Sequence, residues 1–243
     1  MGLALAVFAG WWMASAAHLA PDSILPGPGS VWRAFLDEAT SGRLFDNIVA
    51  SLFRVGVGFG LAIALGVPAG LVLGNWPNWR RLLMPSVNFL RSLSPLAWIP
   101  FAILWFGIGD APSIFLIFMA AVFPLVLATV AAIDGIPSVY HRVGRDYGFA
   151  GASYLFSITL PAIMPDLIAA LRLTAGICWV VVVAAEMIAG RDGLGFAIWD
   201  ARNGLRSDLL VAEMLVIGLI GVALDRLLLR LTRIPSVRWG YDR

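Results

Sequence analysis

The sequence contains no lysine, a single cysteine and only two histidines among its 243 residues. One cysteine, Cys178, excludes an intrachain disulfide and a cysteine-based zinc site, and His18 and His141 are too distant in sequence to suggest a metal cluster. Without lysine, the phosphate-binding loop G-x-x-x-x-G-K-[ST] cannot be completed, so any ATP hydrolysis linked to this chain belongs to another chain. We therefore predict no metal site, no cofactor and no catalytic residue in the chain itself.

Charge is scarce as well. Charged residues make up 13% of the chain, against 60% hydrophobic residues and a mean hydropathy of +0.87, which is far from the composition of a soluble domain. The formal net charge of +2 is too small to indicate a nucleic-acid partner. We predict an all-α membrane protein in contact with lipid, because a helix satisfies its backbone polar groups internally.

Long apolar runs are what the sequence does have. A helix needs about 20 predominantly apolar residues to cross the hydrocarbon core, and six stretches approach this length: 2–20, 55–73, 92–109, 111–133, 167–189 and 209–231. The first is also compatible with a secretory signal peptide, because Ala14-Ser15-Ala16 resembles a cleavage site. The third carries Pro95 and Pro100, which remove backbone donors, so we predict a broken span there.

The arginines predict the orientation, because cytoplasmic flanks of spans are enriched in basic residues. If the N-terminus is inside, eleven arginines lie in cytoplasmic segments and five in external segments. We therefore predict a multi-pass protein with both termini in the cytoplasm. Residues 1–243 show no internal repeat or soluble domain and are expected to form one transmembrane domain. Its largest cytoplasmic connection, about 134–165, is where a soluble partner could dock.

Two further patterns concern helix packing. The turn 25–30 is followed by apolar residues at helical spacing in 31–36, which predicts a short amphipathic helix on the outer surface. In the second span, glycines recur every four positions and would let another helix backbone approach closely. These glycines are Gly56 and Gly60, then Gly66, Gly70 and Gly74. Tight packing within the chain and a dimer-forming face both explain the pattern.

The segment 94–109 combines helix breaks with aromatic rings. Trp98 and Trp105 are seven positions apart, on one face of a regular helix. They fit either an aromatic belt at the membrane interface or a pore lining at a broken helix. Ionisable residues in spans also mark pathways, so the candidate pathway residues are Ser94, Pro95, Trp98, Trp105 and Glu186.

Two acids, Glu186 and Glu213, are expected near the external ends of their spans. There each carboxylate could snorkel to the interface or pair with Arg191 or Arg206 instead of taking part in transport.

The most specific pattern lies in the cytoplasmic connection. Gly148, Ile158, Leu160 and Pro161 match the loop E-A-A-x-x-x-G-x9-I-x-L-P in identity and spacing, so the chain resembles the inner-membrane permeases of binding-protein-dependent ABC importers. Arg142 begins the three residues that stand where this family has E-A-A, so the first half of the motif departs from the family pattern. The motif predicts a short helix before a glycine turn, then a second helix stopped by the proline.

The resemblance extends over nearly the whole chain. The nitrate, sulfonate, taurine and bicarbonate branch of the family is similar in the runs LPGPGSV from residue 25, SLFRV from 51, PLAWIP from 95, WFGIG from 105, AAE from 184 and GLG from 193. Each run is short, and their combination is specific.

The resemblance implies a type I ABC importer permease fold with about six transmembrane helices in a bacterial inner membrane. It also implies three partners: a second permease copy in a homodimer, a cytoplasmic ABC ATPase dimer that binds ATP and Mg²⁺, and a periplasmic solute-binding protein. The residues Arg142, Gly148, Ile158, Leu160 and Pro161 would form the ATPase-coupling loop.

The solute implied by this branch is a small anion, either sulfonate or taurine, or nitrate or bicarbonate. A bare carboxylate would obstruct an anion, so Glu186 is expected to have a structural or gating role before a substrate-binding one. The alternative is an ATP-independent secondary transporter or channel, which needs an ion site or a selectivity ring. The few intramembrane ionisable groups do not cluster in sequence into one.

Overall fold

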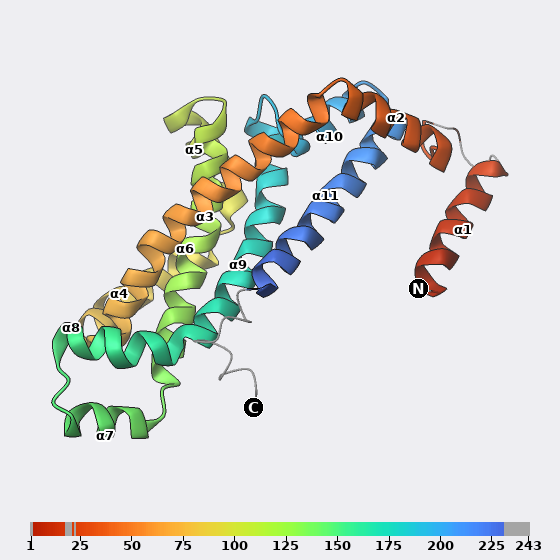
Figure 1. Cartoon of the computed structure of the whole chain (residues 1–243). Coiled ribbons are helices and arrows are strands. Elements are labelled where there is room, and N and C mark those ends of the chain that lie inside the picture. The colour runs from red at the N-terminus through yellow and green to blue at the C-terminus, as the bar shows by residue number, and fades with distance from the viewer. Residues whose placement is uncertain (1, 18–20, 22, 231–243) are drawn as a thin grey trace.

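The computed structural model describes residues 2–17, 21 and 23–230, and every regular element in this part of the chain is helical (Figure 1). The elements are α1 (Gly2–Ala16), α2 (Pro28–Thr40), α3 (Arg43–Asn75), α4 (Pro77–Ser92), the 3₁₀ turn η1 (Pro95–Trp98), α5 (Ile99–Phe106), α6 (Asp110–Asp134), α7 (Ser138–Asp146), α8 (Gly151–Tyr154), the π-helical turn η2 (Leu155–Thr159), α9 (Leu160–Ala189), α10 (Leu194–Asn203) and α11 (Ser207–Leu229). The predicted all-α class is confirmed.

Four helical stretches in the described part of the chain are long and apolar enough to cross a membrane: α3, α6, α11 and the continuous helix Gly151–Ala189. A fifth span arises if α4 and the segment Pro95–Phe106 are counted together, and these two are bent by 86° at the break. The broken third span is therefore present, but it also includes α4. The first predicted span forms α1, whose 15 residues are fewer than a full crossing requires; residues 18–20 of that prediction lie outside the described residues.

The core of the bundle is α6, which packs against α3 on one side and α9 on the other. Leu116, Ile117 and Leu125 of α6 are fully buried. The close approach of α3 uses Gly58, Gly66 and Gly70, at each of which a Cβ would come within about 3 Å of a backbone carbonyl oxygen of α6.

The prediction that the glycines of this helix form a close-packing face is therefore confirmed for three of the five glycines. Gly66, Gly70 and Gly74 do face α6, whereas Gly56 and Gly60 have no atom within 4 Å of an added Cβ. Gly58 takes their place on the contact face, two positions away from each, because the face of α3 that meets α6 continues through Ala62 to Gly58 at four-residue steps.

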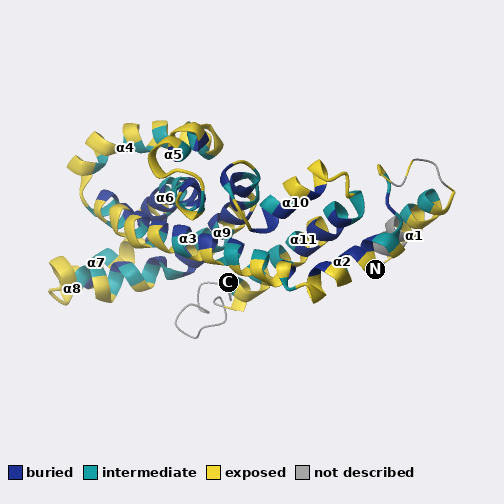
Figure 2. Cartoon of the chain, turned by 90° about the horizontal axis from the view of Figure 1, so that it is seen from above, coloured by how far each residue is buried: buried dark blue, intermediate teal, exposed yellow. Residues whose placement is uncertain are grey.

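The helix α4 stands at the edge of the bundle, and none of its residues is buried (Figure 2). It begins at Pro77, directly after Trp76, so only a short break separates it from α3. Arg80 on α4 donates two hydrogen bonds to Asp134 at the end of α6, at 2.7 and 2.6 Å. This ion pair ties α4 to the end of the core helix.

The predicted loop over 134–165 is shorter than expected, because the chain is helical from Gly151 into α9. Pro161 does not stop the second helix. Proline lacks an N–H and cannot bond the carbonyl four residues back. The π-helical turn η2 just before Pro161 accommodates this missing bond, and there the Leu160 N–H donates to the Leu155 carbonyl. The second half of the segment predicted to couple to an ATPase is thus continuous with a helix long and apolar enough to cross a membrane.

The bundle has two distinct ends (Figure 1). The helices α7 and α8 lie at one end, and α2 and α10 lie at the other. The helix α2 confirms the predicted amphipathic helix: Val31 and Ala34 are buried, whereas Trp32 is exposed. It packs on α11 and on α3.

Candidate functional site

A buried ionic cluster sits at the α2 and α10 end of the bundle, centred on Arg54 of α3. The Arg54 side chain is 1% exposed, although it belongs to a membrane-spanning helix. A buried guanidinium in such a helix is stable only when its donors are paired. Its partners come from α6, from α9 and from the loop 190–193 between α9 and α10.

Arg54 uses all three of its nitrogen atoms. The Nε–H donates to Asp110 Oδ1 at 2.6 Å, and Nη1 donates to Glu186 Oε1 at 2.7 Å and to the Asp192 carbonyl oxygen at 2.8 Å. The third nitrogen, Nη2, donates to the Asp192 carboxylate. One side chain of α3 therefore holds the start of α6, the end of α9 and the following loop.

Glu186 is fully buried and has further donors besides Arg54. Ser51 Oγ lies 2.9 Å from each of its carboxylate oxygens, and the Gly195 N–H donates to Oε2 at 3.0 Å. The same Ser51 Oγ accepts a hydrogen bond from the Leu194 N–H at 3.0 Å. The carboxylate thus anchors the N-terminus of α10 to α3.

Gly193 is required where the loop passes over Glu186. Its φ is +99°, and a Cβ at this position would lie 2.5 Å from Glu186 Cδ. The Gly193 N–H donates to Asn47 Oδ1 at 2.9 Å. Only glycine allows the backbone to lie this close to the buried carboxylate.

The cluster contains one guanidinium and three carboxylates, and they differ in exposure. The side chains of Asp110 and Asp192 are 56% and 59% exposed, whereas Arg54 and Glu186 are buried. Every Arg54 nitrogen is already bound to carboxylate or carbonyl oxygen, and the cluster carries an excess of negative charge. Its chemistry is therefore that of a clamp between segments and not of a receptor for an anion.

The predicted partner of Glu186 was wrong in identity. Glu186 pairs with Arg54, 132 positions away, and not with Arg191 or Arg206. The signal was available in part, because Arg54 directly precedes the predicted span 55–73, Glu186 lies in the predicted span 167–189, and buried charges occur in pairs. Glu213 is also buried, and within the described residues its carboxylate oxygens have no hydrogen-bond partner.

The aromatic candidates come together at the same end. The rings of Trp98 and Trp105 have centroids 6.4 Å apart, which agrees with their expected placement on one face. Phe115 of α6 packs edge-on against both, at 6.4 and 5.9 Å. Trp105 remains 55% exposed, and Ser94 at the break is exposed too.

The coupling-loop candidates lie at the opposite end of the bundle. Gly148 has a φ of +72°, which ends α7 with a turn that other residues rarely adopt. Leu160 packs against the buried cluster at the end of α6, and Ile158 is half-buried. Arg142 and Pro161 are exposed. The structure therefore separates these residues from Glu186, Trp98 and Trp105.

Gly144 stands where the family motif has its second alanine. It is buried, and a Cβ there would lie 2.6 Å from Ile158 Cδ1 and 2.7 Å from Tyr154 Cε2. His141 also stacks on Tyr154, with ring centroids 6.1 Å apart. A small residue at the third motif position lets α7 pack on the helix that leads into the membrane.

A neighbouring side of α7 is apolar and open. Val139, Val143 and Tyr147 follow one another at four-residue spacing and are 57%, 45% and 79% exposed. An exposed apolar stripe on a helix outside the bundle is typical of a docking surface.

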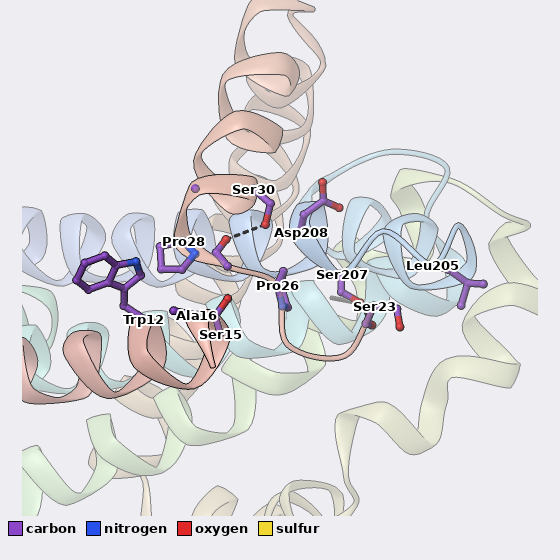
Figure 3. Close-up of a pocket in the computed structure, with 12 residues that line it drawn as sticks. Trp12, Ser15, Ala16, Ser23, Pro26, Pro28, Ser30, Leu205, Ser207 and Asp208 are labelled. Carbon is purple, nitrogen blue, oxygen red and sulfur yellow. Dashed lines mark hydrogen bonds between the residues drawn. The ribbon is translucent and has the colours of Figure 1, made fainter. Parts of the chain in front are cut away.

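A cavity of about 590 Å³ lies where α1 meets α2 and the start of α11 (Figure 3). Figure 3 shows Ser15, Ser30, Ser207 and Asp208 around it. None of the described residues that line it is basic, so this cavity lacks the cation that an anionic ligand needs.

A second cavity, of about 490 Å³, lies beside the ionic cluster. It is lined by residues of both charge signs, among them Arg43, Arg191 and Arg206 together with Asp192 and Asp200. Asp192 therefore stands between the buried Arg54 and open space.

Comparison with known proteins places these features in context. The family model described as "Binding-protein-dependent transport system inner membrane component" matches residues 62–234. The match includes the coupling-loop candidates and Glu186, and it begins eight residues after Arg54.

Curated proteins are similar over most of the chain. The nitrate import permease protein NrtB of Synechococcus elongatus is 35% identical and the alignment covers 96% of this chain and 88% of that protein. The bicarbonate transport system permease protein CmpB of the same species is 35% identical over 86% and 80%. The taurine transport system permease protein TauC of Escherichia coli is 31% identical over 88% and 80%.

A solved structure shares the fold. The inward-facing MetNI methionine ABC transporter contains a chain that matches with a TM-score of 0.64 and 20% identity, over 79% of this chain and 97% of that chain.

Proposed function

The chain belongs to the family of binding-protein-dependent transport system inner membrane components, and from this membership we propose that it imports a small anion delivered by a solute-binding protein. The relatives named for nitrate, bicarbonate and taurine support this class of solute. The observation that carries the proposal is the position of residues 138–161, the coupling segment. This segment begins with α7, which projects from one end of an all-helical membrane bundle (Figure 1).

The energy for transport comes from a partner ATPase that docks on α7. The stripe of Val139, Val143 and Tyr147 supplies an apolar contact, and Arg142 supplies charge beside it. The segment through Gly148, Ile158, Leu160 and Pro161 then transmits a displacement of α7, because Gly144 packs α7 directly on the start of the long helix. ATP and Mg²⁺ bind to the ATPase.

The pathway runs between two copies of the chain. The uncovered helix α4, which has no buried residue, supports this arrangement, because a second copy would cover it. The break at Ser94 and Pro95 and the exposed ring of Trp105 face the pathway, with Trp98 behind them. Glu186 takes part by holding the outer loop and not by touching the solute, because its carboxylate is enclosed by Arg54 and Ser51.

The orientation follows from the coupling segment. An ATPase docked on α7 puts that end of the bundle in the cytoplasm, and α1 begins and α11 ends toward the same end (Figure 1). Both termini are then cytoplasmic, in agreement with the distribution of arginines. The ionic cluster and the aromatic rings lie at the outer end, where the binding protein delivers its solute.

The test is co-purification from the native membrane. The tagged chain is extracted in mild detergent, its stoichiometric partners are identified by mass spectrometry, and vanadate-sensitive ATP hydrolysis is measured. We expect an equimolar ATPase that is lost in Val143→Asp and retained in Phe45→Asp, a matched substitution at an exposed site near the opposite end. A chain that purifies alone and moves solute without ATP would instead be a secondary transporter or channel.

A further inference from the structure

The ionic cluster has a rigid part and a releasable part. Arg54 and Glu186 have opposite charges, are almost fully buried and lie 2.7 Å apart. Separating them would leave two unpaired charges in a low-dielectric interior, which is strongly unfavourable. Glu186 is held by Ser51 and Gly195 in addition, so this pair is expected to persist in every conformation of the transporter.

The other two carboxylates are in a different situation. Asp110 and Asp192 are more than half exposed, so water hydrates them as soon as they leave Arg54. Arg54 itself is buried, so its Nε and Nη2 donors need water in place of the two carboxylates. The pair that remains after their release is neutral. The contacts of Arg54 with Asp110 and Asp192 can therefore break while its contact with Glu186 stays.

The two releasable carboxylates lie on neighbouring segments at the end of α9. Asp110 begins α6 and Asp192 lies in the loop 190–193, and the Gly109 N–H donates a 3.2 Å hydrogen bond to the carbonyl of Ala189, the last residue of α9 before that loop. Asp192 borders the 490 Å³ cavity, which gives its side chain space to enter. Release of the Asp192 carboxylate would leave this loop held by hydrogen bonds of its backbone, from Arg54 to the Asp192 carbonyl and from the Gly193 N–H to Asn47.

We propose that Arg54 is a positioning residue for transport, which stays paired with Glu186 while Asp192 and Asp110 leave it as the outer end of the permease opens. This inference rests on the proposed function, because it assigns the cluster to the outer gate of an importer. The Arg54–Glu186 pair stays in place when this gate opens. The Asp192 carboxylate is the latch, which binds Arg54 in the closed gate and leaves it in the open one. The closed gate is favoured whenever the latch carries a negative charge that Arg54 can bind.

The test uses the permease with its ATPase in proteoliposomes, with Asp192→Cys as the variant. Cys178 is fully buried, so a charged methanethiosulfonate reagent reacts at the new, exposed site. The loss of the ion pair between Arg54 and the half-exposed Asp192 carboxylate should shift the balance toward the open gate and raise ATP hydrolysis without binding protein by about two- to fivefold. A reagent that adds a sulfonate should restore the low rate, whereas one that adds a trimethylammonium group should not.

Two controls separate this role from a structural one. Asp200→Cys is an exposed acid at the same end, outside the cluster, and neither the substitution nor the reagents should change the rate. Arg54→Met with Glu186→Gln removes both buried charges, so the chain should fold, yet it should hydrolyse ATP at the raised rate because no cation remains for the latch.

The outcomes are distinct. If Asp192→Cys hydrolyses ATP at the wild-type rate, or if both reagents act alike, the latch is refuted while the importer function stands. If the wild-type complex has no ATPase at all, the proposed function is refuted, and the gate assignment is refuted with it.

Discussion

Gly70 tests the packing between α3 and α6 with a single methyl group. A Cβ at this position would lie 2.5 Å from Thr129 Cβ and 2.9 Å from the Val126 carbonyl oxygen. Both atoms are fixed by the backbone of α6, so rotation of a side chain cannot relieve the clash. The two helices must move apart along their closest contact.

The matched control is Gly56, which lies on the same helix and has no atom within 4 Å of an added Cβ. Both Gly70→Ala and Gly56→Ala gain the same helix propensity, about 1 kcal/mol. The difference between them is therefore the overpacking, about 1–3 kcal/mol. For a chain of this size each kcal/mol corresponds to about 2–4 °C, so Gly70→Ala should unfold roughly 2–12 °C below Gly56→Ala.

The assay is thermal unfolding of the purified permease in detergent, followed by the fluorescence of its ten tryptophans. Equal unfolding temperatures for the two variants would show that α3 and α6 are not as close as the structure places them.

Three further predictions concern the end of the bundle where α7 and α8 lie (Figure 1). Gly148→Val places a β-branched residue at φ +72°, which is strained by about 1–2 kcal/mol, so the number of solute molecules imported per ATP hydrolysed should fall; an unchanged ratio would refute a role for this turn. Gly144→Leu should displace α7 from Tyr154 and reduce the amount of ATPase that co-purifies, whereas full recovery would show that α7 does not need this packing. Arg80→Ala removes an exposed ion pair with Asp134 and should lower stability by at most about 1 kcal/mol, and a larger loss in thermal unfolding would mean that this pair is buried in the assembled transporter.

The sequence predicted those parts of the fold that depend on local composition. Apolar length identifies α3, α6, α9 and α11 because the bilayer requires about 20 apolar residues regardless of their neighbours. The break before Pro95 and the amphipathic pattern of α2 are local features too, and both are present in the structure.

The parts that were wrong depend on which elements meet in space. Glu186 has arginines nearby in sequence, but its partner is Arg54 because the end of α9 packs beside α3. Pro161 would end a helix in water, yet the turn η2 carries the helix through it. Gly58 joins the contact with α6 although Gly56 and Gly60 form the clearer sequence pattern, because the position of α6 decides which face is used.

ATP-dependent uptake is the most direct measurement of the central claim. The chain is reconstituted with its ATPase and its solute-binding protein in proteoliposomes, and uptake of labelled nitrate, bicarbonate and taurine is followed with and without ATP. The account predicts uptake of one of these solutes that requires both ATP and the binding protein and is abolished by vanadate. Uptake that proceeds at the same rate without ATP, driven by a solute or ion gradient, would contradict it.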